Sequence, residues 1–208
     1  MDMTQYIKTE FDRSAATLKA TAERNAERIS QAGELLLHCL RAGGKVIIFG
    51  NGGSASQANH FAAELVGRFR RERRSLPALA LNSDSALVTA IGNDYGFEHI
   101  YSRQVEALVK PGDLVIGITT SGKSPNVLNG LLTAKQCKAD TLMLTGEIDP
   151  SDAKILEFNN FPETESIILP VPSSDTARIQ EAHLVIIHLL CELVEREFHT
   201  GDSEKPER

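Results

Sequence analysis

Five short apolar runs alternate with segments of helical periodicity, and this alternation constrains the fold more than any other feature of the 208-residue sequence. The runs are Lys45–Phe49, Leu76–Leu81, Leu114–Ile118, Thr141–Leu144 and Ile167–Pro170. Short apolar runs alternating with helices are typical of buried parallel strands joined by right-handed crossovers. The sequence therefore predicts an α/β fold with a doubly wound, mainly parallel five-stranded sheet flanked by helices.

Helical patterns fill the rest of the chain and suggest a single domain over residues 1–200. An N-terminal helical region of one or two helices is predicted over about residues 4–41, before an α/β core over about residues 45–198. The further predicted helices are Ser56–Phe69, a helix capped by Asp84 and ending near Ile91, Ile100–Val109, Pro125–Lys138 and Thr176–Phe198, with a short one near Asp152–Phe158 in a polar, irregular stretch. Residues 201–208 form a charged tail that we expect to be disordered.

Composition narrows the classes of function. The formal charge of −6 argues against general nucleic-acid binding, and the basic run Arg68–Arg74 reads as a solvated helix end except for Arg68. The three cysteines Cys39, Cys137 and Cys191 lack the CxxC spacing of thiolate metal sites and read as buried thiols in a reducing compartment. No signal peptide and no apolar stretch of membrane-spanning length is evident, so the sequence predicts a cytoplasmic protein.

The turn Gly50–Ser56 follows the first predicted strand and leads into a predicted helix. Glycines let the backbone approach an anion, and the free N–H groups of a first helical turn donate to its oxygens, so this unit predicts a phosphate cradle. On the following helix, His60 and Glu64 lie four residues apart and share one face. An isolated pair of this kind would be a surface contact, whereas beside a cradle it is suited to acid-base or metal chemistry.

A second cradle is predicted after the third strand, where hydroxyl side chains replace glycines. Its spacing matches neither the Walker motif nor the dinucleotide fingerprint, which disfavours a nucleoside triphosphatase. Any one of these hydroxyls would read as a loop or cap residue, but five at two strand ends favour binding of a small phosphate ester. The five are Ser54, Thr119, Thr120, Ser121 and Ser124.

The last predicted helix carries Gln180, His183 and His188 among apolar residues. A lone histidine in such a setting is more often a core residue than a catalyst. Gln180 and His188 are separated by about 12 Å along an ideal helix axis, so their spacing permits a shared metal ion without requiring one.

Four motifs in order resemble the sugar isomerase (SIS) domain of the phosphoheptose isomerase family, over about residues 4–198. They are Gly50–Ala55 with His60, Glu64 and Arg68, then Ala90–Gly96, Thr120–Ser124 and Arg178–Glu181. The resemblance implies conversion of sedoheptulose 7-phosphate to D-glycero-D-manno-heptose 7-phosphate, the first step of activated heptose synthesis for lipopolysaccharide and other glycans. It also implies a homotetramer with active sites between subunits.

The resemblance further implies one zinc ion per site and assigns roles to matching residues. The implied metal ligands are His60, Glu64, Gln180 and His188. The implied substrate contacts are Asn51, Gly52, Gly53, Ser54, Glu64, Arg68, Asn93, Asp94, Thr119, Thr120, Ser121, Ser124, Asp175 and Gln180.

These residue types suit an aldose-ketose isomerisation, which moves a carbonyl between C1 and C2 through an enediol. We expect Glu64 to act as the general base and His188 as its acid-base partner. Zinc, where bound, would polarise the carbonyl.

Other functions remain open at this point. A non-catalytic SIS protein that binds the bacterial replication initiator shares the fold and much of the pattern, and a related isomerase would act on another sugar phosphate. A sugar-phosphate sensor joined to a DNA-binding module is disfavoured, because the first 44 residues show no helix-turn-helix.

Overall fold

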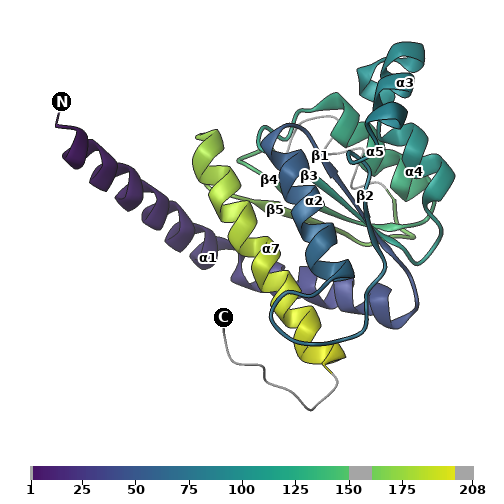
Figure 1. Ribbon diagram of the computed structural model, residues 1–208, viewed down its shortest axis with the longest axis horizontal. Helices are drawn as coiled ribbons and strands as arrows, with labels where there is room; N and C mark the ends of the chain where they lie inside the picture. Colours follow the sequence, from purple (N-terminus) through teal and green to yellow (C-terminus); the bar gives the residue numbers. More distant parts are fainter. Residues whose placement is uncertain (1, 150–160, 200–208) are drawn as a thin grey trace.

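The computed structural model describes residues 2–149 and 161–199, with a five-stranded sheet between two layers of helices (Figure 1). The strands are β1 Val46–Gly50, β2 Ala78–Ala80, β3 Leu114–Thr119, β4 Asp140–Thr145 and β5 Ser166–Pro170. Every neighbouring pair is parallel, in the order β2-β1-β3-β4-β5. The predicted α/β class and the parallel five-stranded sheet are confirmed.

The register of the sheet brings the two predicted cradles together. Gly50 pairs with Ile118 and Thr119 pairs with Thr145, so β1, β3 and β4 end at nearly the same level. The chain leaves β1 for β2 on one side and later adds β3 on the other, which makes the β1–β3 boundary the switch point of the topology. Parallel sheets bind ligands beyond the carboxyl ends of their strands at such a point.

Helices cover both faces of the sheet. The helices α1 Met3–Arg41, α2 Gly53–Val66 and α7 Thr176–Phe198 share one core cluster with the sheet. The other face packs against α3 Ser85–Tyr95, α4 Ser102–Leu108 and α5 Pro125–Gln136, and the 3₁₀-helix Phe97–His99 lies against these helices. The fold is therefore doubly wound, with α2 and α7 side by side on one face.

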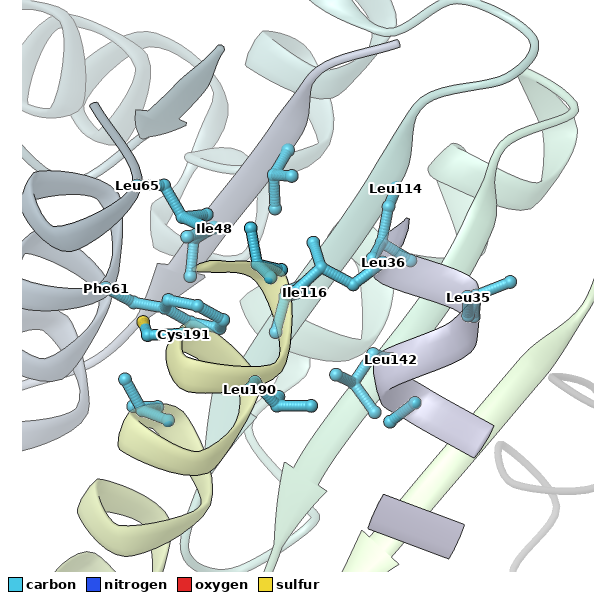
Figure 2. Packing of buried hydrophobic residues seen from close by; sticks show 14 of the residues in the cluster. Leu35, Leu36, Ile48, Phe61, Leu65, Leu114, Ile116, Leu142, Leu190 and Cys191 are labelled. Atoms are coloured by element: carbon cyan, nitrogen blue, oxygen red, sulfur yellow. The ribbon is translucent and has the colours of Figure 1, made fainter. Parts of the chain in front are cut away.

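Strand periodicity divides the apolar side chains between the two faces. Ile48 and Ile116 lie in the cluster with α1, α2 and α7, whereas the adjacent Ile47 and Val115 lie in the opposite one. Figure 2 shows Phe61 of α2 and Cys191 of α7 close together beside the strand residues. Because all these side chains are almost fully buried, α2 and α7 are held firmly on the sheet.

The N-terminal region is one helix rather than two, and α1 extends well beyond the rest of the molecule (Figure 1). Its second half is buried through Ile29, Leu36 and Leu40, whereas Met3 and Phe11 near its start are each 74% exposed. The predicted range of the last helix is confirmed as α7 Thr176–Phe198.

Several other helix boundaries differ from the prediction, most of all those of α2 and α3. Helix α2 begins at Gly53 instead of near Ser56 and ends at Val66 instead of Phe69, and α3 continues past Ile91 to Tyr95. The predicted short helix near 152–158 and the tail 201–208 lie outside the described residues. The three cysteines are free, and no described helix has the length and hydropathy required to cross a membrane.

Candidate active site

The first turn joins β1 directly to α2. Gly52 has φ 54°, a conformation that glycine adopts without the steric penalty of a Cβ atom. A Cβ on Gly50 would lie 2.7 Å from the carbonyl oxygen of Ile118, so glycine there allows the close approach of β3. This geometry starts α2 at Gly53, at the carboxyl end of β1, where the helix dipole favours an anion, while the N–H groups of Ser54 and Ala55 donate to the carbonyls of Asn51 and Gly52.

An amide pair joins this turn to the second one. Asn51 and Asn126 donate to each other's side-chain oxygens at 2.9 and 2.8 Å, and the Tyr101 hydroxyl donates to the carbonyl of Gly50. Asn126 is 1% exposed and was not recognised from the sequence. The available signal was an amide at the second position of α5, directly after Pro125.

The second turn gathers three hydroxyl groups. Thr119 Oγ1 lies 3.1 Å from Ser124 Oγ and 3.5 Å from Ser121 Oγ, which accepts from the backbone N–H of Lys123. Ser124 occupies the N-cap position of α5, where its carbonyl accepts from the N–H of Leu128 but its hydroxyl makes no capping bond. The three hydroxyls therefore lie together in one turn, where they are able to donate to an anion; phosphate binding there stays a prediction. Thr120 is half-buried in the same turn.

His60, Glu64 and His188 lie together beside the first turn. The two Nε2 atoms of His60 and His188 are 3.0 Å apart, and His60 Nδ1 lies 3.5 Å from a carboxylate oxygen of Glu64. The carboxylate favours a proton on His60 Nδ1, which leaves Nε2 to accept from the Nε2–H of His188. The three side chains therefore form a short path along which a proton can be held or moved.

The environment of His188 favours the neutral imidazole. The ring of Phe69 stacks on it with centroids 5.1 Å apart and an interplanar angle of 21°. Burial lowers the pKa of His188 below its ordinary value, nearby His60 and Arg70 lower it further, and Glu64 opposes them. A neutral imidazole near pH 7 is able to both accept and donate a proton.

Gln180 lies at the other end of the α2–α7 contact. Its side-chain amide packs on Gly53, where a Cβ would come within 2.5 Å of Nε2, and its backbone carbonyl accepts from the Gln57 side-chain amide at 2.7 Å. His188 meets α2 two turns further along, at His60. The structure thus places Gln180 at the glycine turn and does not bring its amide to the histidine pair.

Four predicted substrate contacts lie apart from this cluster within one chain. Asn93 and Asp94 are exposed on α3 and hydrogen-bond to each other at 2.8 Å. Arg68 is exposed with its Nε 3.9 Å from Glu72. Asp175 caps α7 by accepting from the N–H of Ala177. Of the remaining predicted contacts, Ser54 is buried in the first turn of α2.

The ligand types at the histidine pair suit zinc, although they are not arranged as a closed site. Two imidazole nitrogens 3.0 Å apart, with a carboxylate nearby, are donors that zinc accepts. Glu64, however, faces the ring nitrogen of His60 that points away from His188. In residues 2–149 and 161–199, no three His, Cys, Asp or Glu side chains are grouped to hold a metal ion.

The segment after α2 contains a buried ion pair that the sequence pattern did not reveal. Arg73 is 7% exposed, which corrects its prediction as part of a solvated helix end, and its guanidinium lies 3.7 Å from the carboxylate of Glu195. Arg73 also donates to the carbonyls of Leu65 and Gly67. These bonds satisfy carbonyls at the end of α2, so the helix stops at Val66 and Phe69 is free to lie against His188.

The chain is similar to known proteins over most of its length. A family model described as SIS domain matches residues 11–146. The chain is 48% identical over 193 residues to the phosphoheptose isomerase of Aquifex aeolicus, covering 93% of this chain and 96% of that protein.

Two solved structures with the same description are also similar. The phosphoheptose isomerase from Neisseria gonorrhoeae is 38% identical with a TM-score of 0.83, covering 93% of this chain and 99% of its own. The one from Francisella tularensis is 38% identical with a TM-score of 0.86, covering 94% of this chain and all of its own.

Proposed function

The chain belongs to the phosphoheptose isomerase family of SIS-domain proteins, and on that basis we propose that it converts sedoheptulose 7-phosphate to D-glycero-D-manno-heptose 7-phosphate. This family consists of aldose-ketose isomerases that act on sugar phosphates. The observation that best supports the proposal is the cluster of Glu64, His60 and His188 beside two turns suited to an anion. The product would enter the synthesis of activated heptose.

In the proposed mechanism, Glu64 removes a proton from C1 of the ketose. The C1–H electron pair forms the C1=C2 bond of the enediol while O2 gains a proton. The O1–H proton is then lost and C2 gains a proton, which produces the aldehyde at C1. His188 moves the protons on the oxygens, since its lowered pKa keeps it neutral near pH 7.

The two turns and Gln180 would hold the substrate. The hydroxyls of Thr119, Ser121 and Ser124 suit the phosphate, because they offer several neutral hydrogen-bond donors in one turn. The amide of Gln180 at Gly53 suits a sugar hydroxyl. Asn93, Asp94 and Arg68 stay predictions for an assembled site.

We also propose that the site binds zinc through His60 and His188, with Glu64 as a further ligand. Because an atom bound to zinc cannot accept a proton, Glu64 and His188 would act as zinc ligands and as proton carriers at different stages of the reaction. Gln180 joins this set only if its amide leaves Gly53. Bound zinc would polarise the substrate carbonyl. Metal analysis of the purified protein tests this directly: wild type should carry zinc, and the double substitution His60→Ala/His188→Ala should not.

The homotetramer is proposed from the family and from the exposed apolar side chains on the first half of α1. Met3, Tyr6, Ile7 and Phe11 are between 48% and 74% exposed. Such a helix face is stabilised when a second copy covers it. Light scattering should give the mass of four chains, whereas a monomeric mass would contradict an active site shared between subunits. Cytoplasmic residence remains a prediction.

The proposed reaction is tested by following sedoheptulose 7-phosphate by NMR with zinc-loaded and metal-stripped protein. We expect an aldoheptose phosphate, and the two preparations show how far turnover depends on the metal. A folded tetramer that produces none in either form would contradict the proposal. That outcome would favour an isomerase of another sugar phosphate or the non-catalytic protein that binds the replication initiator.

A further inference from the structure

One face of α7 carries both the proposed acid-base residue and the groups that fix the loop above it. His188, Glu192 and Glu195 are separated by four and three residues, so their side chains share one side of the helix. The facing loop connects α2 to β2 and supplies Phe69, Arg70 and backbone N–H groups. The position of this loop is therefore set relative to His188 by the same helix.

Glu195 attaches the loop between α2 and β2 to α7. Its carboxylate accepts backbone N–H bonds from Phe69 at 2.7 Å, Arg70 at 2.8 Å and Arg71 at 3.0 Å, and it is 1% exposed. The guanidinium of Arg73 lies 3.7 Å away and balances its charge. Three charge-assisted bonds to consecutive residues leave the backbone at Phe69 little freedom.

The Phe69 ring connects this loop to His188. This ring stacks on His188 at 5.1 Å, while Arg70 lies 5.0 Å over it and pairs with Glu192 at 3.3 Å. Within residues 2–149 and 161–199, the His188 ring has His60 as its hydrogen-bonding partner, so the stack is a second constraint on its ring plane. A proton-transfer group loses efficiency when its orientation is relaxed.

We infer that Phe69, held in place by the Glu195–Arg73 ion pair, is a positioning residue that orients the His188 imidazole for proton transfer. The catalytic part of this inference rests on the proposed isomerase function. The orientation itself is a property of the protein without substrate, which allows the two to be tested separately.

The test compares Phe69→Leu with Phe198→Leu as a matched control. Phe198 is also partly buried against the same core cluster and lies under an arginine, Arg74, but its ring does not stack on His188. We expect Phe69→Leu to lower kcat about 10- to 100-fold with KM unchanged. Phe69→Tyr, which keeps the stacked ring, should restore kcat, and Phe198→Leu should leave both constants unchanged.

The second readout is the ring-carbon NMR signal of His188 in labelled protein, assigned by its loss in His188→Gln. Stacking should shift the attached proton upfield in wild type, and Phe69→Leu and Glu195→Gln should both remove that shift. An unchanged signal in Phe69→Leu, or an equal loss of kcat in Phe198→Leu, would overturn the inference. Absence of wild-type turnover would refute the proposed function alone, because the His188 signal requires no substrate.

Discussion

The turns after β1 and β3 occupy equivalent places in two strand-turn-helix units, but the two units differ in the side chains of their turns and helices. The first turn is glycine-rich, and its helix α2 carries His60 and Glu64. The second turn is hydroxyl-rich, and the first two turns of its helix α5 contain no ionisable side chain. Under the proposed function, the same supersecondary unit would carry the reactive groups in one copy and the phosphate-binding groups in the other.

This difference shows how a site of this kind separates chemistry from binding. In the proposed site, neutral hydroxyl donors of the second turn would bind the phosphate, whereas His60 and Glu64 lie on α2, which packs against α7 and its His188. The Asn51–Asn126 pair fixes the distance between the two units. Substitutions in each unit should therefore give different kinetic signatures.

The largest expected effect is on turnover and lies in the first unit. Glu64→Gln keeps the shape of the side chain and removes the base, so kcat should fall about 10²- to 10⁴-fold while the affinity for the sugar phosphate is retained. Turnover by NMR and binding by calorimetry check the two parts. Glu106→Gln, on the exposed side of α4, is the control, and near-normal turnover of Glu64→Gln would exclude it as the base.

The next largest expected effect is a pH-dependent loss of stability caused by His183, whose ring lies against the end of β4. His183 is fully buried, its Nε2 lies 3.1 Å from the carbonyl of Thr145, and burial lowers its pKa from 6.5 to about 4. Between these values the unfolded chain binds a proton that the folded protein excludes. The free energy of unfolding should therefore fall by up to about 3 kcal/mol as the pH drops from 6.5 to 4.

Denaturant titrations at several pH values test this, with His183→Gln as the comparison. Glutamine is able to donate to the same carbonyl and does not titrate in this range. The variant should lose less stability than wild type over the same interval, and equal losses would show that other groups cause the pH dependence.

A smaller loss of stability is expected when the Asn51–Asn126 pair, which joins the two units, is broken. Asn126→Ala removes both bonds of the amide pair and leaves the Asn51 side chain without this partner, which should cost about 1–3 kcal/mol in urea denaturation. Asn129→Ala on the same helix is the matched control, because its one bond to the carbonyl of Glu98 is exposed. An equal loss of unfolding free energy in the two variants would contradict a stabilising role of the Asn51–Asn126 pair.

The smallest effect should come from a single hydroxyl in the second unit. Ser124→Ala deletes one of several phosphate donors, so KM should rise about fivefold with kcat unchanged, consistent with about 1 kcal/mol. Ser102→Ala is the control, because the Ser102 hydroxyl donates to the backbone carbonyl of His99 and does not belong to the second turn. A loss of kcat instead would break the proposed division between binding and chemistry.

Much of this arrangement was predictable because local patterns determine it. Apolar runs predicted the strands, and the glycine and hydroxyl turns predicted that two polar turns follow strands whose carboxyl ends meet at one edge of the sheet. The proximity of His188 to His60 was implied by the family resemblance but not by spacing, since it depends on α2 and α7 packing side by side.

The long-range contacts that hold the site in place were not predictable from the sequence. Arg73 and Glu195 are 122 residues apart in sequence, and only the folded chain shows that they pair and end α2 before Phe69. Asn126 was missed for the same reason, because its partner belongs to the other strand-turn-helix unit.

The most direct test of the central claim is the fate of hydrogen when sedoheptulose 7-phosphate is converted in D₂O. A partly exposed carboxylate base exchanges its proton with solvent, so proton transfer through Glu64 predicts deuterium at C2 of the aldose. Aldose formed without any deuterium would point to direct hydride transfer between the carbons and contradict the role of Glu64 as the base.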